Sequence, residues 1–330
     1  MGEVHEWRPR RSRCGELVQW DSSTHDWLEG RGERIYLISM IDDATSRLFA
    51  RFVRQDSSAE NRRLLGSYLE RFGRPLAFYT DKAGMFQAAV KTKRQEQREG
   101  RDRPLREPTQ IERALRELQV VWIPAHSPQA KGRVERQFAT AQDRLVKGMR
   151  VADVRTIEEA NAHLQKEYLP WWNRVLTVPP VEAADAHRPL GKEHDLAAIL
   201  SHVEPRQVTN DYTVHYHGKV YQIDRRDIRV GMRKATVRVE ERLDGTSAVC
   251  FQCAYVRVRP CDAARARIAA SSNGRYETAA PGPSPKTQKR LDAGVLDSVG
   301  PFFTPGHRGV QCARAKPGDG SHGRSPKPQL

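Results

Sequence analysis

The sequence predicts an α/β domain with a mixed five-stranded sheet and flanking helices, followed by a small all-β barrel-like domain and a disordered tail. Near the N-terminus, three strand-like segments follow one another, and helical and strand-like segments alternate after them. Further along, short alternating segments are separated by turn signals. The expected boundaries are an irregular basic lead-in over 1–13, a core over 14–190, a β domain over 203–260 and a tail over 262–330.

The first three strands are expected over 16–21, 34–43 and 47–53. The second of these is a nearly continuous apolar run, which is typical of a central strand with both faces covered. The connections between the three segments are short, and short connections favour antiparallel neighbours. The sequence therefore predicts that the domain begins with an antiparallel meander.

Helical spacing begins after the third strand. Over residues 58–72, apolar side chains recur on one helical face, and Gly73 and Pro75 then end the helix. The remaining elements of the core are expected in this order: a strand at 76–80, a helix at 109–118, a strand at 120–124, a helix from about 128 to the region of Val146, and a helical stretch at 156–168 before Trp171-Trp172-Asn173. Alternation of this kind after a meander predicts a mixed sheet with helices on both faces.

The second region shows strand-like alternation with turns at His217-Gly218 and Asp244-Gly245. Its strands are expected at 212–216, 220–223, 235–239 and 248–251. From residue 262 onward, apolar residues become scarce, and 11 Lys and Arg residues face 5 Asp and Glu residues, a surplus of 6. Such a composition is typical of a disordered basic tail.

Charge restricts the class of partner. The chain has 56 Lys and Arg residues against 41 Asp and Glu residues, a formal charge of +15. An excess of this size favours nucleic acid as a partner, through phosphate contacts without sequence preference. The alternative is a basic surface with no partner. No segment approaches the ~20 apolar residues of a membrane span, and the N-terminus lacks a signal-peptide core, so we expect a cytoplasmic protein.

Three acids stand at related places in the predicted fold. Asp21 ends the first strand, Asp81 follows the fourth, and Glu135 lies on the helix after the fifth. If the first and fourth strands are neighbours, these side chains meet at one edge of the sheet. Carboxylates are the ligands that Mg²⁺ prefers, and a pair of such ions can stabilise the attacking and leaving oxygens of a phosphodiester reaction.

The alternative is that each acid is a cap or a surface charge. Asp26, Asp42 and Asp43 compete with the three chosen acids. Residues 42–45 in particular have the composition of a turn after the second strand, with Asp43 as its capping residue.

The sequence around these acids resembles a known family. The segments that carry the resemblance are Trp20-Asp21-Ser22-Ser23, Ile41-Asp42-Asp43-Ala44-Thr45-Ser46-Arg47, Tyr79-Thr80-Asp81 and His126-Ser127-Pro128-Gln129-Ala130-Lys131-Gly132-Arg133-Val134-Glu135-Arg136. They resemble the ribonuclease-H-like catalytic core of DDE transposases and integrases in the retroviral-integrase superfamily, above all insertion-sequence transposases of the ISNCY type. The resemblance covers about residues 14–190, and its most specific element is Ser-Pro-Gln-x-x-Gly-x-x-Glu.

The resemblance implies that Asp21, Asp81 and Glu135 are catalytic and bind Mg²⁺ or Mn²⁺, as two ions. It implies DNA strand transfer, in which a 3′-hydroxyl attacks a target phosphodiester. The implied partners are DNA, as element ends and target, and further copies of the chain in a synaptic complex. On the same helix, the side chains expected to contact DNA are Gln129, Lys131, Arg133 and Arg136, although a solvated helix face would also explain the cations.

Two other functions stay open. One is a ribonuclease-H-like nuclease that only hydrolyses DNA. The other is a non-catalytic DNA-binding remnant of a truncated transposase, because family members carry an N-terminal helix-turn-helix region and only a few arginines precede residue 14. The region 203–260 resembles the small barrel that often follows the core in such transposases and binds DNA without strong sequence demand.

Overall fold

The computed structural model describes residues 9–80, 108–124 and 132–261. Within this part, the chain divides into two compact units. The first unit contains the described residues up to Glu204 together with Val239–Ala248, and the second contains Pro205–Arg238 and the described residues from Val249 onward. Asp21 and Glu135 both belong to the first unit.

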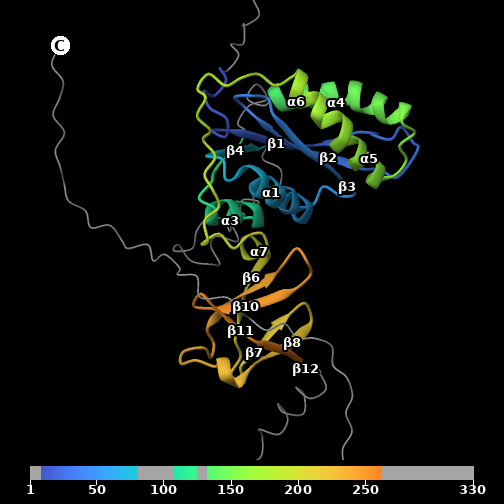
Figure 1. The fold of residues 1–330 in the computed structure, drawn as a ribbon. Coiled ribbons are helices and arrows are strands. Elements are labelled where there is room, and N and C mark those ends of the chain that lie inside the picture. The colour runs from blue at the N-terminus through green and yellow to red at the C-terminus, as the bar shows by residue number, and fades with distance from the viewer. Residues whose placement is uncertain (1–8, 81–107, 125–131, 262–330) are drawn as a thin grey trace, which may run out of the picture. The chain divides into compact units, whose positions relative to one another are not determined.

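A five-stranded sheet forms the centre of the first unit (Figure 1). Its strands are β1 (Val18–Thr24), β2 (Tyr36–Asp42), β3 (Leu48–Val53), β4 (Ala77–Thr80) and β5 (Val121–Pro124). The order is β3-β2-β1-β4-β5; β2 is antiparallel to both β1 and β3, and β4 is parallel to β1 and β5. The predicted meander and the mixed sheet are thus confirmed, and β1 and β4 are neighbours, which is the condition under which the three acids could meet.

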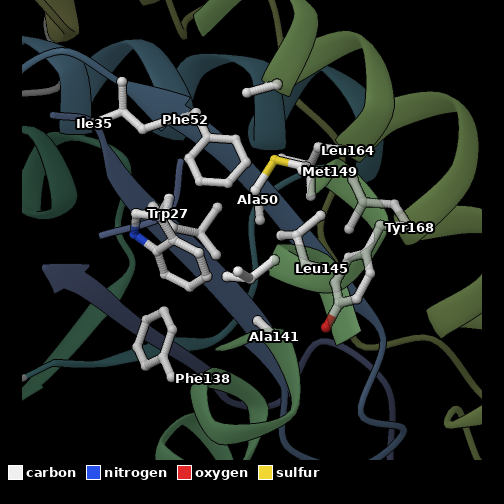
Figure 2. Packing of buried hydrophobic residues seen from close by; sticks show 14 of the residues in the cluster. Trp27, Ile35, Ala50, Phe52, Phe138, Ala141, Leu145, Met149, Leu164 and Tyr168 are labelled. Carbon is white, nitrogen blue, oxygen red and sulfur yellow. The ribbon is translucent and has the colours of Figure 1, made fainter. Parts of the chain in front are cut away.

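Helices cover both faces of this sheet. The elements are α1 (Ser58–Phe72) and α3 (Gln110–Glu117) on one face, and α4 (Gly132–Val151), α5 (Ile157–His163), the π-helix η2 (Leu164–Tyr168) and α6 (Leu169–Val175) on the other. Strand side chains alternate between faces, so each strand contributes to two cores. Ile38 and Met40 pack with α1 and α3, whereas Leu37 and Ile41 pack with α4, α5 and α6. Figure 2 shows the second of these cores. This arrangement is the predicted ribonuclease-H-like α/β fold.

Local signals explain where the helices begin and end. Ser57 caps α1 by accepting a hydrogen bond from the Glu60 amide, and Gly73, at φ 87°, ends the helix, so α1 has the predicted bounds. The α4 helix continues to Val151, about one turn past the predicted end. The stretch predicted as one helix over 156–168 is instead α5 followed by the wider turn of η2.

The later part of the described chain is mainly β structure. Its strands are β6 (His202–Gln207), β7 (Thr213–Tyr216), β8 (Lys219–Ile223), β9 (Thr236–Glu241), β10 (Ser247–Phe251), β11 (Ala254–Val256) and β12 (Val258–Cys261), and a short helix, α7 (Leu196–Ile199), precedes them. In the second unit, β8 pairs antiparallel with β7 and β12, and β10 pairs with β11. The four predicted strands are present, whereas β6, β11 and β12 were not predicted.

The predicted turn at His217-Gly218 is also present between β7 and β8. Both residues have positive φ, 47° and 72°, as a two-residue hairpin turn requires. Among the described residues, no helix has the length and apolar character needed to cross a membrane.

Candidate active site

Asp21 lies within the central strand β1, on the face that α4 covers, and not at the end of the strand as predicted, because β1 continues to Thr24. It is half-buried, stands opposite Ser39 of β2, and accepts a hydrogen bond from the Ser22 amide at 3.0 Å. Its neighbour Trp20 points to the other face, where its indole N–H donates to Asn61 at 3.0 Å. Because side chains alternate along a strand, Asp21 shares its face with Gln19.

Gln19 connects this face to the start of α4. Its Oε1 accepts a hydrogen bond from the backbone N–H of Val134 at 3.2 Å. The first amides of a helix have no partner within the helix, so a side-chain acceptor there fixes the helix end. Glu135 is the next residue, exposed on the first turn. The bond therefore holds the turn that carries Glu135 against the strand that carries Asp21.

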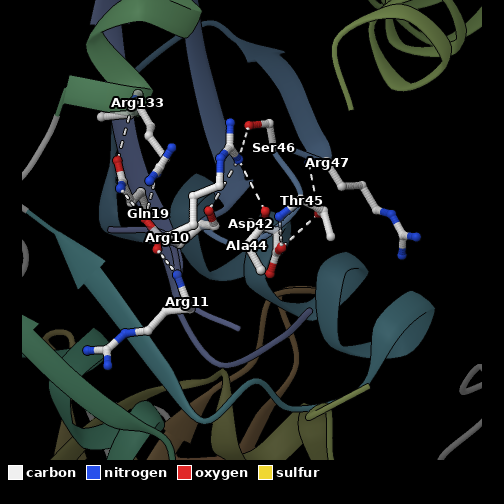
Figure 3. Close-up of polar contacts among 11 residues, drawn as sticks. Arg10, Arg11, Gln19, Asp42, Ala44, Thr45, Ser46, Arg47 and Arg133 are labelled. Atoms are coloured by element: carbon white, nitrogen blue, oxygen red, sulfur yellow. Dashed lines mark hydrogen bonds and ion pairs between the residues drawn. The ribbon is translucent and has the colours of Figure 1, made fainter. Parts of the chain in front are cut away.

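A buried carboxylate completes this connection. Asp43 is 0% exposed and accepts hydrogen bonds from the Gln19 side-chain amide and the Arg133 Nε, each at 2.9 Å, and from the Arg11 backbone N–H at 2.9 Å. Figure 3 shows Gln19 and Arg133 facing each other within this network. A buried charge is tolerated only when it is paired and hydrogen-bonded, and Asp43 meets both conditions.

Arg10 extends the network along the loop after β2. Its guanidinium donates to the Ser46 hydroxyl at 2.8 Å and to the carbonyl of Ala44 at 3.2 Å. Burial lowers the pKa of Arg10, and the nearby charge of Arg133 lowers it further. The guanidinium groups of Arg10 and Arg133 thus lie close together near the first turn of α4.

Asp42, and not Asp43, organises the turn after β2. Its Oδ1 accepts from the Thr45 amide at 2.8 Å and the Thr45 hydroxyl at 2.7 Å, and its Oδ2 accepts from the Gly15 amide at 2.8 Å. The prediction that Asp43 caps residues 42–45 is wrong, because the side chain of Asp43 is engaged by β1 and α4 instead.

The structure describes four of the seven predicted site residues: Asp21, Arg133, Glu135 and Arg136. Asp81, Gln129 and Lys131 lie outside the described residues. The described part of β4 ends at Thr80, and Gln19 of β1 pairs with Tyr79.

Gln19 and Asp43 were not predicted as parts of the site. The signal for Gln19 was a polar residue between two apolar residues, Val18 and Trp20, of a central strand, where a buried amide needs partners.

The surroundings of Asp21 fit a hydrated divalent ion. Two buried side chains on the α4-covered side, Ser39 and Gln137, have polar atoms without a hydrogen-bond partner among the described residues. Buried polar atoms usually find a protein partner, water or an ion. Mg²⁺ binds carboxylate oxygens and keeps several waters, so Asp21 and Glu135 have the right chemistry, and the unpaired hydroxyl of Ser39, opposite Asp21, can bond to such a water.

A second group of potential ligands serves the fold. In the described ranges, Cys14, Asp185 and His187 have ligand atoms within 4.8 Å of one another. However, both ring nitrogens of His187 have partners: Nδ1 lies 2.6 Å from Asp185 and Nε2 lies 2.8 Å from the Tyr68 hydroxyl. Burial raises the pKa of the Cys14 thiol to about 11, so this sulfur is protonated at neutral pH. The contacts of His187 therefore serve the fold, because they connect the C-terminal part of the core to Tyr68 of α1.

The sheet order and the helices on both faces give the first unit a ribonuclease-H-like fold, with Asp21 on one face of the sheet and Glu135 on the helix that covers this face. No protein-family model matches the chain. It is 36% identical to the putative transposase y4bF of Sinorhizobium fredii over 243 residues. The matched region is 73% of this chain and 51% of that protein. The chain is 29% identical to the transposase for insertion sequence IS1202 of Streptococcus pneumoniae over 220 residues. This region is 66% of this chain and 45% of that protein.

The chain is thus similar to transposases, as its motifs predicted, and it spans about half the length of the curated relatives it matches. Among solved structures, it is similar to the HTLV-2 integrase catalytic core domain in complex with magnesium, with a TM-score of 0.34 and 13% identity over 48% of this chain and 85% of that one. It is also similar to a simian T-cell lymphotropic virus intasome, with a TM-score of 0.37 and 12% identity over 78% and 82%. At TM-scores this low, we draw nothing further from these likenesses.

Proposed function

We propose that this chain carries the catalytic core of a DDE-type polynucleotidyl transferase, which joins DNA strands by attack of a 3′-hydroxyl on a target phosphodiester. The observation that carries the proposal is the hydrogen bond from the Val134 amide to Gln19. It fixes the first turn of α4, and with it Glu135, on the face of β1 that presents Asp21. The similarity to transposases supplies the class of reaction.

Asp21 and Glu135 would hold Mg²⁺ or Mn²⁺, as two ions, together with Asp81, whose assignment follows from its motif alone. When bound, such ions stabilise charge on the attacking and leaving oxygens. Gln19 and Asp43 would act through position, because they determine where α4 begins relative to β1.

The proposed DNA contacts are Gln129, Lys131, Arg133 and Arg136. Arg136 is exposed on the first turn of α4. Arg133 uses Nε for Asp43, and its guanidinium has further N–H groups that can meet a phosphate. Within this proposal, residues 14–190 are the catalytic core, 203–260 bind DNA without sequence preference, 262–330 form a basic tail, and copies of the chain assemble on the element ends and the target.

The experiment is a strand-transfer assay with labelled DNA in Mg²⁺ and in Mn²⁺. It compares the wild type with Glu135→Gln and with Asp143→Asn, a matched control because Asp143 is an exposed acid on the same helix that pairs with Lys147. We expect joined products from the wild type and the control and none from Glu135→Gln. Nicks without joined strands would identify a nuclease.

A binding measurement accompanies the assay, since end recognition can require more of the protein than its core. Mn²⁺ should raise the melting temperature of the wild type and of Asp143→Asn more than that of Glu135→Gln, because an ion that binds only the folded state stabilises it. Equal shifts in all three proteins, without joined products, would favour a DNA-binding remnant.

A further inference from the structure

A cavity of about 420 Å³ lies where α4, α5, η2 and α6 meet. We propose that it binds a strand of nucleic acid, with a base against Trp171 and phosphates against Arg144, Lys166 and Arg174. Arg144 follows Glu135 by nine residues (144 − 135) on α4, or about 14 Å along the helix axis. The cavity is therefore a separate site, and binding there requires neither metal nor strand transfer.

The charge of the cavity wall favours an anion. Three of its residues are exposed cations, Arg144, Lys166 and Arg174, and one, Glu167, is an acid. Burial lowers the pKa of His163, which also lines the cavity and therefore adds little charge at neutral pH. Arg144 is partly neutralised by Asp143 at 3.3 Å. The balance remains positive, and cations beside an aromatic ring are the usual means of holding a nucleic-acid strand.

Two aromatic side chains form part of the same wall. The ring of Trp171 is partly buried and lies 5.6 Å from the ring of Tyr168, at an interplanar angle of 39°. The volume of the cavity lies in the range of small-ligand sites, which is about 300–1,000 Å³. A base can stack on the accessible part of Trp171 while the flanking phosphates meet the cations.

Tyr168 lines the cavity with its ring, while its hydroxyl lies in the hydrophobic core beside Leu145 and Ala141 (Figure 2). It is 5% exposed, and its hydroxyl has no hydrogen-bond partner among the described residues. A buried hydroxyl without a partner is costly, so such groups are usually satisfied by a protein group, a water or a ligand. Tyr168 is also the last residue of η2, and π-helical turns occur frequently at functional sites.

The test is the binding of a short fluorescent oligothymidylate strand, measured by anisotropy without divalent metal. The main variant is the double charge reversal Lys166→Glu with Arg174→Glu. Its matched control is Arg51→Glu, an exposed cation of β3 on the opposite face of the sheet. We expect the double variant to bind about tenfold more weakly at low salt, with a smaller salt dependence, and the control to stay within about twofold of the wild type.

Two further variants examine the base and the hydroxyl. Trp171→Leu should weaken binding of the oligothymidylate about fivefold or more but leave an abasic strand of equal length unaffected. Tyr168→Phe should leave binding within about twofold of the wild type and the melting temperature unchanged or higher, because it removes an unsatisfied hydroxyl that lies in the core.

Several outcomes would overturn the site. Wild-type affinity in the double variant excludes the cavity from strand binding, and equal effects of Trp171→Leu on both strands exclude base stacking. More effective competition by an acidic peptide than by the oligonucleotide would assign the cavity to a protein partner. Glu135→Gln should bind the strand like the wild type, so a failure of the catalytic proposal and a failure of this one give different results.

Discussion

Arg133 and Asp43 form an ion pair at 2.9 Å, although 90 residues separate them in the sequence. The carboxylate is fully buried, whereas the guanidinium is partly accessible. The pair joins the first turn of α4 to the loop after β2, and Gln19 contacts both partners of this junction, Asp43 directly and α4 through the Val134 amide. Arg133, which was predicted from its motif to contact DNA, thus has a structural role as well.

The first prediction concerns stability. Asp43→Ala removes the acceptor of three donors and leaves Arg133 partly buried without its partner. Breaking a buried ion pair from one side costs about 3–5 kcal/mol, which should appear as a large drop in the urea midpoint. Asp26→Ala is the control, since Asp26 is exposed and accepts one local hydrogen bond from Gly30. A midpoint for Asp43→Ala equal to that of the control would contradict the buried pair.

The second prediction concerns the start of α4. Gln19→Leu keeps the approximate volume but removes both hydrogen bonds of the amide, leaving the Val134 N–H without an acceptor. The expected loss is about 1–3 kcal/mol for each unsatisfied group, with faster hydrogen exchange at Val134 than at amides in the middle of α4. Unchanged exchange at Val134 would show that another group takes over.

The third prediction concerns a buried amide. Gln137 is 1% exposed, and neither end of its side-chain amide has a hydrogen-bond partner among the described residues. Gln137→Leu should leave the metal-free protein equally stable or more stable, since replacing an unsatisfied polar group by an apolar one of similar volume is favourable. If Gln137 instead holds waters of a bound ion, the same variant should reduce the increase in melting temperature caused by Mn²⁺. Destabilisation without metal would mean that the amide already has a partner.

The fourth prediction concerns pH. The pKa of Cys14 is raised by burial from 9.0 to about 11, so the folded state favours the neutral thiol. This contribution to stability is complete below pH 9.0 and is lost as the pH rises through about 11, where the buried thiol must ionise. Unfolding free energies measured between these values should fall more steeply for the wild type than for Cys14→Ala. Parallel curves for the two proteins would exclude the raised pKa.

The elements of the core could be predicted because their signals are local. Ser57 and Gly73 define α1 through its own caps, and the apolar run of β2 is visible without any partner. The antiparallel meander and the mixed sheet could be predicted too, since short connections and alternating elements restrict the topology.

The contacts around Asp43 could not be predicted in the same way. Nothing local distinguishes Asp42 from Asp43, and the direction of the Asp43 carboxylate depends on β1 and α4, whose contact residues lie 24 and 90 residues away from Asp43. The wide turn of η2 was missed for a similar reason, because its sequence continues a helical pattern and only packing makes the turn wider.

The hydrogen bonds around Gln19 form a closed ring. It runs from the Val134 amide to Gln19, from Gln19 to Asp43, from Asp43 to Arg133, and back to Val134 through the chain itself. In a closed ring, no member can rotate without straining the others, so these bonds hold the first turn of α4 in one position against β1. In the proposed site, any adjustment of the Glu135 carboxylate to an ion therefore has to come from the torsions of its own side chain, and the shorter acid of Glu135→Asp would be misplaced without help from the backbone.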